Sequence, residues 1–408
     1  MRLFNIPKIA LPLLAGLLFV FAGGSVFAQD GLNLEVTGEI KTGLFAEQRI
    51  LNRGEPLKHA RMYNNDGDSG SGEGRIRLGL NLTMENYGIR TRFFQDAFDR
   101  GTSVNDTNIL KKKVRIDYAY AYANAFDEQL KISAGLLGES PWGTGGTELF
   151  KELEYTNSGE SLTGIRTEIM PSIVPGRLNI GFVLNRADDT MPSDAKEKFG
   201  DLFLESVLGI AWEMDDLFAF RFAYRLDRGI DSPAAVVNGE RLAYRVEERI
   251  LNTLLPGMAV WANGYGFGIN AGKGSGRTGV PGYIQHWLYI MYDPENFTAG
   301  VTTGYYDGFT DETYKMEVRP YYYHKLLDNF LVVGAMAGME IGFKNGKSLK
   351  DKNEAFYNFW FVEPQVKANI NSNLYTALVY RFTSGSYGTN YFRDQTTHWV
   401  NLRLVYTF

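Results

Sequence analysis

Apolar and polar residues alternate with a period of two along most of the chain beyond residue 31. From Leu32 to Phe45 one face carries Leu34, Val36, Ile40 and Leu44, and the other carries Asn33, Glu35, Glu39 and Lys41. Such alternation predicts a β-strand with one apolar face. The segment is long for a strand of a soluble domain, but it fits a tilted strand that crosses a bilayer and its interfaces.

The same pattern recurs between short turns and long loops. It returns in Ile76 to Met84, with arginine on the polar face, and again from Ile89 to Phe93 after a tight turn. Further short turns are expected at Phe126–Glu128, Pro171–Gly176, Met214–Asp216, Asn263–Gly264, Asp293–Asn296, Leu327–Asn329 and Asn371–Asn373. Long loops are expected at Gln48–Gly74, Gly138–Glu160, Arg228–Pro256 and Ser384–Gln395.

Short turns that alternate with long loops are typical of a transmembrane barrel with a periplasmic rim and an outer rim. We therefore predict an all-β, antiparallel up-and-down barrel of about eighteen strands. About sixteen is the fallback, because the hairpin assigned to Met258–Lys273 is short and rich in Gly. A soluble β-sandwich would need shorter strands and two inner faces. Alternation also predicts outward aromatic rows, namely Tyr118, Tyr120 and Tyr122, and Phe218, Phe220, Phe222 and Tyr224.

Both ends of the chain refine this interpretation. Residues 1–28 have a basic start, an apolar run from Ile9 to Ala22 and small residues before Gln29, which predicts a cleaved signal peptide and a barrel over residues 29–408. Beyond Asp30 no apolar run reaches the length of a transmembrane helix. The chain contains no cysteine, so neither disulfides nor thiolate metal sites are available.

The last residues, Trp399 to Phe408, alternate again, with Val400, Leu402, Leu404, Tyr406 and Phe408 on one face. This strand resembles the closing strand and assembly signal of outer-membrane barrels of Gram-negative-type bacteria, and the chain resembles their general or substrate porins. The resemblance implies a location in the outer membrane, contact with its lipid, and recognition of Phe408 by the barrel-assembly machinery. The sequence leaves open whether the barrel is a monomer or a homotrimer.

The polar faces of the early strands carry a row of cations, here called the cation ladder, which we expect to line the lumen. Its members are Arg75, Arg77, Arg90, Arg92, Arg115, Lys131 and Arg166. Rings of charge set the selectivity of pores. Asp96, Asp117 and Glu168 could instead neutralise the ladder as ordinary ion pairs.

The loop Gly138–Glu160 resembles the constriction loop that general porins fold into the barrel. It has a Pro-aromatic-Gly stretch, Pro141 and Trp142, followed by the acidic residues Glu148, Glu152 and Glu154. The alternative is a surface loop that never enters the lumen. If the loop enters, its carboxylates would face the ladder, and an excess of inward cations predicts a weak anion preference.

Two further segments have open interpretations. Tyr321, Tyr323, Phe359, Phe361, Tyr375 and Trp399 are expected to face inward among charged residues, either to stack sugar rings or to pack beneath a loop. Within the loop Arg228–Pro256, the spacing of Leu242, Val246, Ile250 and Leu254 predicts a helix over residues 239–255, which would gate the mouth or pack on the rim.

Other chemistry has little support. The stretch Asn64–Glu73 lacks the ligand spacing of a calcium loop, and the four histidines show no metal-ligand spacing. His398 with Asp394 is the best pair for a membrane hydrolase, and it is weak. We therefore expect no enzyme activity, cofactor, metal or nucleic-acid partner. The sequence favours a passive porin for small hydrophilic solutes; the alternative is a barrel with an occluded lumen whose outer loops bind host or surface ligands.

Overall fold

The structure is a computed structural model. It describes residues 31–51, 57–62, 75–96, 115–137, 142, 162–185, 206–225, 241–267, 283–308, 313–344, 347–348, 358–386 and 395–408. The expected signal peptide and its cleavage before Gln29 lie outside the described residues.

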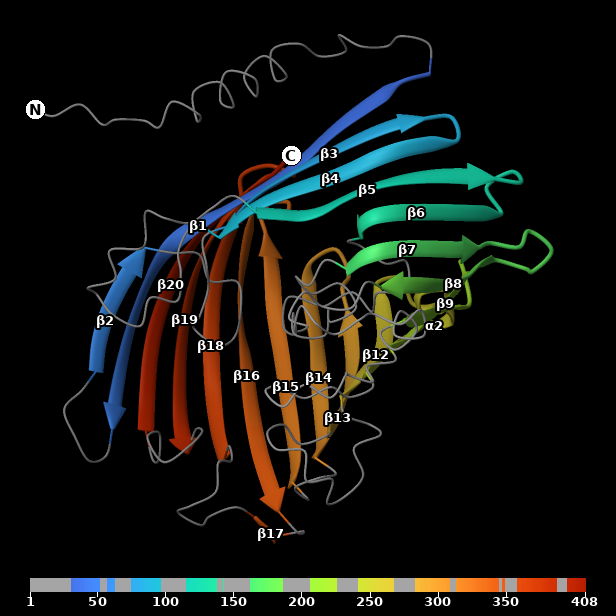
Figure 1. The fold of residues 1–408 in the computed structure, drawn as a ribbon. Helices are drawn as coiled ribbons and strands as arrows, with labels where there is room; N and C mark the ends of the chain where they lie inside the picture. The colour runs from blue at the N-terminus through green and yellow to red at the C-terminus, as the bar shows by residue number, and fades with distance from the viewer. Residues whose placement is uncertain are drawn as a thin grey trace, which may run out of the picture.

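The chain forms a closed antiparallel barrel of 18 strands, as predicted. Each barrel strand pairs with its neighbours in sequence, and β1 closes the barrel by pairing with both β20 and β3 (Figure 1). The barrel strands are β1 (Asn33–Leu51), β3 (Arg75–Met84), β4 (Tyr87–Asp96), β5 (Arg115–Ala125), β6 (Leu130–Leu137), β7 (Leu162–Ile169), β8 (Arg177–Asn185), β9 (Val207–Met214), β10 (Phe218–Arg225), β11 (Arg241–Glu248), β12 (Met258–Phe267), β13 (Tyr283–Tyr292), β14 (Phe297–Gly308), β15 (Thr313–Leu326), β16 (Leu331–Lys344), β18 (Asn358–Asn369), β19 (Leu374–Ser386) and β20 (Gln395–Thr407). Two short strands, β2 (Leu57–Met62) and β17 (Lys347–Ser348), pair with β1 and β16.

The two faces of the wall differ in chemistry. Outward positions are exposed and apolar, among them Ile40, Ile76, Ile132, Leu208, Leu288, Val333, Leu378 and Leu402. Inward positions hold the buried polar and aromatic side chains, among them Arg166, Glu168, Asn263, Arg319, Glu363 and Asn401. The apolar exterior suits contact with acyl chains, and closure pairs each of the 18 barrel strands on both sides.

The last strand has the predicted alternation. Val400, Leu402, Leu404 and Tyr406 are exposed, whereas Asn401 and Val405 are buried. Phe408 exchanges backbone hydrogen bonds with Gly38 of β1 at 2.7 and 3.0 Å. Any Cβ at Gly38 would overlap the Phe408 ring, so the absence of a side chain at this position admits that ring.

Most predicted short turns are observed, and they share one end of the barrel, here called the short-turn rim (Figure 1). The turn predicted at Asn263–Gly264 is wrong, because both residues lie inside β12. The helix predicted over residues 239–255 is also wrong, because β11 occupies Arg241–Glu248 and only α2 (Ile250–Leu254) is helical. An interval of four residues keeps a side chain on one face of a strand as well as of a helix, so Leu242 and Val246 fit both structures. The predicted number of strands is nevertheless correct, because the missed strand β11 is balanced by the one extra strand of the hairpin assigned to Met258–Lys273.

The outward orientation predicted for Tyr118, Tyr120 and Tyr122 is wrong as well. Ile116 is 51% exposed, but Tyr118, two residues later, is only 5% exposed. The register between β4 and β5 shifts at this point. Arg92 pairs with Tyr118 and Phe93 with Ile116, so Asp117 has no paired residue opposite it in β4. This β-bulge inserts one residue and exchanges the faces of the strand beyond it. The outward orientation of Phe218, Phe220 and Phe222 is correct, since Ala219 and Ala223 are buried on the opposite face.

Outward aromatic side chains gather near the short-turn rim. Trp212 and Phe218 meet edge to face at 5.0 Å, Tyr292 and Phe297 do so at 5.7 Å, and Phe297 stacks on Tyr322 at 5.6 Å. We call these five residues the aromatic girdle. Among the described residues, no helix is long and apolar enough to cross a membrane.

Candidate functional site: the lumenal wall

The cation ladder occupies neighbouring strands of one wall. Arg77 lies in β3, Arg90 and Arg92 in β4, Lys131 in β6 and Arg166 in β7. Their paired positions share the inward face: Arg90 lies opposite Tyr120, Arg92 opposite Tyr118, and Arg166 opposite the buried Ser133. The side chains of Arg75, Arg115, Asp96 and Asp117 lie outside the described set, as do Pro141, Glu148, Glu152 and Glu154 of the expected constriction loop.

The tyrosines of β5 give the ladder its aromatic partners. The Arg92 guanidinium carbon lies 4.7 Å from the centre of the Tyr118 ring, and that of Arg166 lies 5.5 Å from the Tyr120 ring. The Tyr122 ring has the Arg90 guanidinium carbon at 5.7 Å and the Lys131 ammonium nitrogen at 4.8 Å. A cation over a ring face is attracted by the ring quadrupole. Tyr118, Tyr120 and Tyr122, the tyrosine row, therefore hold these like charges in a fixed arrangement.

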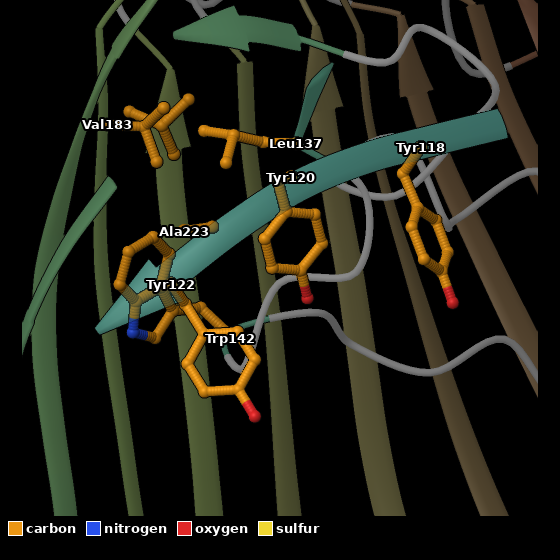
Figure 2. Close-up of a cluster of buried hydrophobic side chains, with 8 residues drawn as sticks. Tyr118, Tyr120, Tyr122, Leu137, Trp142, Val183 and Ala223 are labelled. Atoms are coloured by element: carbon orange, nitrogen blue, oxygen red, sulfur yellow. The ribbon is translucent and has the colours of Figure 1, made fainter. Parts of the chain in front are cut away.

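Trp142 lies inside the barrel, next to the tyrosine row. Its side chain is fully buried and packs in one cluster with Tyr118, Tyr120, Tyr122, Leu137, Val183, Val207 and Ala223 (Figure 2). A Cβ built on Gly181 of β8 or on Gly209 of β9 would overlap the indole ring. These two glycines, which pair with each other, form a slot in the inner wall that only the absence of side chains leaves open. At Trp142, therefore, the chain lies against the lumenal wall.

Hydrogen bonds and an ion pair connect Trp142 to the cation ladder. The indole Nε1 donates to Asn179 Oδ1 at 2.9 Å, and Asn179 Nδ2 donates to Glu168 Oε2 at 2.8 Å. Glu168 in turn pairs with Arg166 at 2.8 Å, and both side chains are buried. The sequence identified Glu168 as a neutralising acid, but it missed Asn179 and the glycine slot. A signal was available, because Gly181 and Gly209 interrupt strands in which bulky inward residues are usual.

A second cluster lies on the wall formed by β18, β19 and β20. The Arg381 guanidinium carbon lies 4.3 Å from the centre of the Phe361 ring and 5.2 Å from that of Trp399, and Arg381 Nε pairs with Glu363 at 2.5 Å. Lys367 lies over Tyr375 at 4.3 Å. Phe361 and Trp399 are buried, so these aromatic side chains face inward as predicted and pack against cations.

His398, which was considered for hydrolysis, is on the outward face of β20. His398 Nδ1 and the Tyr380 hydroxyl share a hydrogen bond of 2.7 Å, and His398 packs edge to face on Phe382. Tyr380 is on the exposed, outward face of β19. Asp394, the proposed partner of His398, lies outside the described residues.

This chain is similar to known proteins in its fold and not in its sequence. No protein-family model and no curated protein sequence matches it. The structure of OpdQ of Pseudomonas aeruginosa is similar, with a TM-score of 0.52, 10% identity, and coverage of 92% of this chain and 98% of that one. The outer membrane channel DcaP of Acinetobacter baumannii has a TM-score of 0.50, 10% identity, and coverage of 95% and 100%. Identities this low establish the architecture alone. The chain has the 18-strand barrel fold of outer-membrane porins.

Proposed function

We propose that this protein is a passive, water-filled channel of the outer membrane for small hydrophilic solutes, with a weak preference for anions. The apolar exterior and the aromatic girdle support the membrane location, because aromatic rings collect at the interfaces of a bilayer. The observation that carries the channel is the inward cation ladder with its tyrosine row. Fixed cations that line a narrow lumen attract anions and repel cations.

The loop that contains Trp142 would narrow this lumen. Support comes from the indole ring in the glycine slot, which brings the chain at Trp142 to the level of the tyrosine row. Carboxylates from the rest of the loop, Glu148, Glu152 and Glu154, would then face the ladder and complete a transverse field. Passage would favour small, polar solutes.

The selectivity test replaces Arg77, Arg90 and Arg92 with Gln. This variant removes fixed charge from one wall and keeps polar, hydrogen-bonding side chains there. The reversal potential of the refolded protein in a salt gradient should move toward cation preference. The shift should shrink at high salt, because the screening length falls to about 3 Å at 1 M. An unchanged reversal potential in a folded, conducting variant would show that these arginines do not line the path of the ions.

One observation favours a second candidate, a barrel with an occluded lumen whose outer loops bind a ligand. Phe361, Glu363, Arg381 and Trp399 are all buried although they face inward, as expected for a lumen that is filled at this wall. Planar-bilayer recording of the refolded wild type separates the candidates. Stable single-channel steps support the channel, and a folded barrel that never conducts supports the occluded form.

A further inference from the structure

The connection between β11 and β12 exposes a compact set of apolar side chains at the short-turn rim. Ile250, Leu251, Leu254 and Leu255 are 40–74% exposed, and α2 buries none of its residues. No charged residue occurs from Ile250 to Gly257. Leaving several large apolar side chains in water is unfavourable, so such a set indicates an apolar partner.

Some backbone N–H groups of this segment are hydrogen-bonded locally. The Leu251 N–H donates to Glu248 Oε1 at 2.9 Å, and the Gly257 N–H donates to Asn252 Oδ1 at 3.0 Å. Because these backbone N–H groups already have hydrogen-bond acceptors, the free-energy cost of moving the segment into a less polar medium is lower. The leucines, by contrast, are left on the surface.

The base of the segment is fixed to the barrel. Arg249, the residue before α2, pairs with Glu213 of β9 at 2.5 Å and with Glu247 of β11 at 3.2 Å. The Arg249 N–H also donates to the Leu217 carbonyl in the neighbouring turn at 3.0 Å. These contacts hold α2 at a set height on the rim.

The aromatic girdle is interrupted at this hairpin. Trp212 and Phe218 lie on the β9–β10 side, and Tyr292 and Phe297 lie on the β13–β14 side. Between them, the outward residues of β11 and β12 nearest the rim are Val246, Glu248, Met258 and Val260, and none is aromatic. The exposed leucines therefore stand where the girdle has its gap.

We propose that α2 and Leu255 insert into the interfacial layer of the periplasmic leaflet and complete the girdle there as a lipid-facing anchor. The occupant is a phospholipid surface, recognised through apolar contact rather than charge, because interfacial binding grows with the buried apolar area and this segment has no charged residue. This inference rests on the outer-membrane location in the proposed function. It adds a specific lipid contact to a turn that would otherwise face water.

The absence of cysteine allows a direct test with single-cysteine variants. Leu254→Cys carries an environment-sensitive NBD fluorophore on α2. Glu295→Cys carries it on the polar turn of the adjacent β13–β14 hairpin, as a matched control at the same rim. Leu288→Cys places it on the outward face of β13, as a reference for insertion of the barrel. Each protein is refolded into phospholipid vesicles with nitroxide labels on the acyl chains, either near the headgroups or deep.

The Leu254 probe should emit at shorter wavelength than the Glu295 probe and be quenched most by the shallow nitroxide. The Leu288 probe should be quenched by the deep one. If the Leu288 probe is quenched but the Leu254 probe matches the Glu295 probe and is quenched by aqueous iodide, the anchor is refuted while the barrel remains membrane-embedded. If the Leu288 probe itself escapes quenching, the membrane location fails, and the anchor with it.

Discussion

Replacement of Trp142 by Ala is the sharpest perturbation that the lumenal wall offers. It removes a fully buried indole from the glycine slot together with the hydrogen bond to Asn179. Loss of a buried Trp side chain costs about 3–5 kcal/mol, and about 3 kcal/mol already changes an equilibrium constant more than a hundredfold. The barrel wall keeps its backbone pairing, so the cost should fall on attachment of the loop rather than on the fold.

The assay is single-channel recording of refolded protein. The alanine variant should show larger unit conductance and more open-channel noise, with unchanged heat-modifiable mobility on gels. Trp142→Phe should lie closer to wild type, because it keeps most of the packing and loses mainly a hydrogen bond worth about 1 kcal/mol.

A reciprocal variant tests the slot without touching the loop. Gly209→Ala places a methyl group where the indole now lies, so it should reproduce the Trp142→Ala currents. Gly79→Ala is the matched control, since its Cβ would press only on the Thr37 hydroxyl, a group that can rotate away. Wild-type conductance and noise in both Trp142→Ala and Gly209→Ala would show that Trp142 packs on the wall without narrowing the pore.

Two predictions concern stability, both measured as the urea midpoint of unfolding in vesicles. Glu363→Gln should destabilise the barrel by about 3 kcal/mol, because Arg381 keeps its buried charge and loses the carboxylate at 2.5 Å. The control is Asp293→Asn, which breaks the more exposed pair with Lys325 and should destabilise the barrel by less than about 1 kcal/mol. An equal effect of both would contradict this reasoning. Glu128→Gly should stabilise by up to about 1 kcal/mol, because φ of +65° strains a residue with a side chain; Asn329→Gly, at +66°, should gain less, since Asn tolerates this region better. A loss of stability in Glu128→Gly would refute the assignment of strain.

The sequence predicted the architecture because a membrane barrel repeats one physical constraint in every strand. Each strand must be apolar outward and must pair on both sides, so alternation and turn spacing identify it locally. The prediction for the region of β11 and β12 was wrong because an apolar spacing of four residues is compatible with both a strand and a helix. Only the pairing of Leu242 with Tyr224 and with Gly266 decides between them, and such pairing is a tertiary property.

The charged residues of the lumenal site could be predicted from the sequence, but the residues that they and Trp142 contact could not. Arginines on the polar face of a strand can be identified from the alternation alone, whereas the slot for Trp142 requires Gly181 and Gly209 to be adjacent across two strands. The network from Trp142 through Asn179 and Glu168 likewise joins Trp142 to both strands of the β7–β8 hairpin. No local pattern records such contacts.

The bulge at Asp117 links these findings. Without the inserted residue, strict alternation from Ile116 would turn Tyr118 and Tyr120 toward lipid, and Arg92 and Arg166 would lose their ring partners. Like charges on adjacent strands repel, and rings that attract each cation oppose this repulsion without neutralising the charge. The irregularity that interrupts the alternation is therefore what gives Arg92 and Arg166 their aromatic partners on this wall.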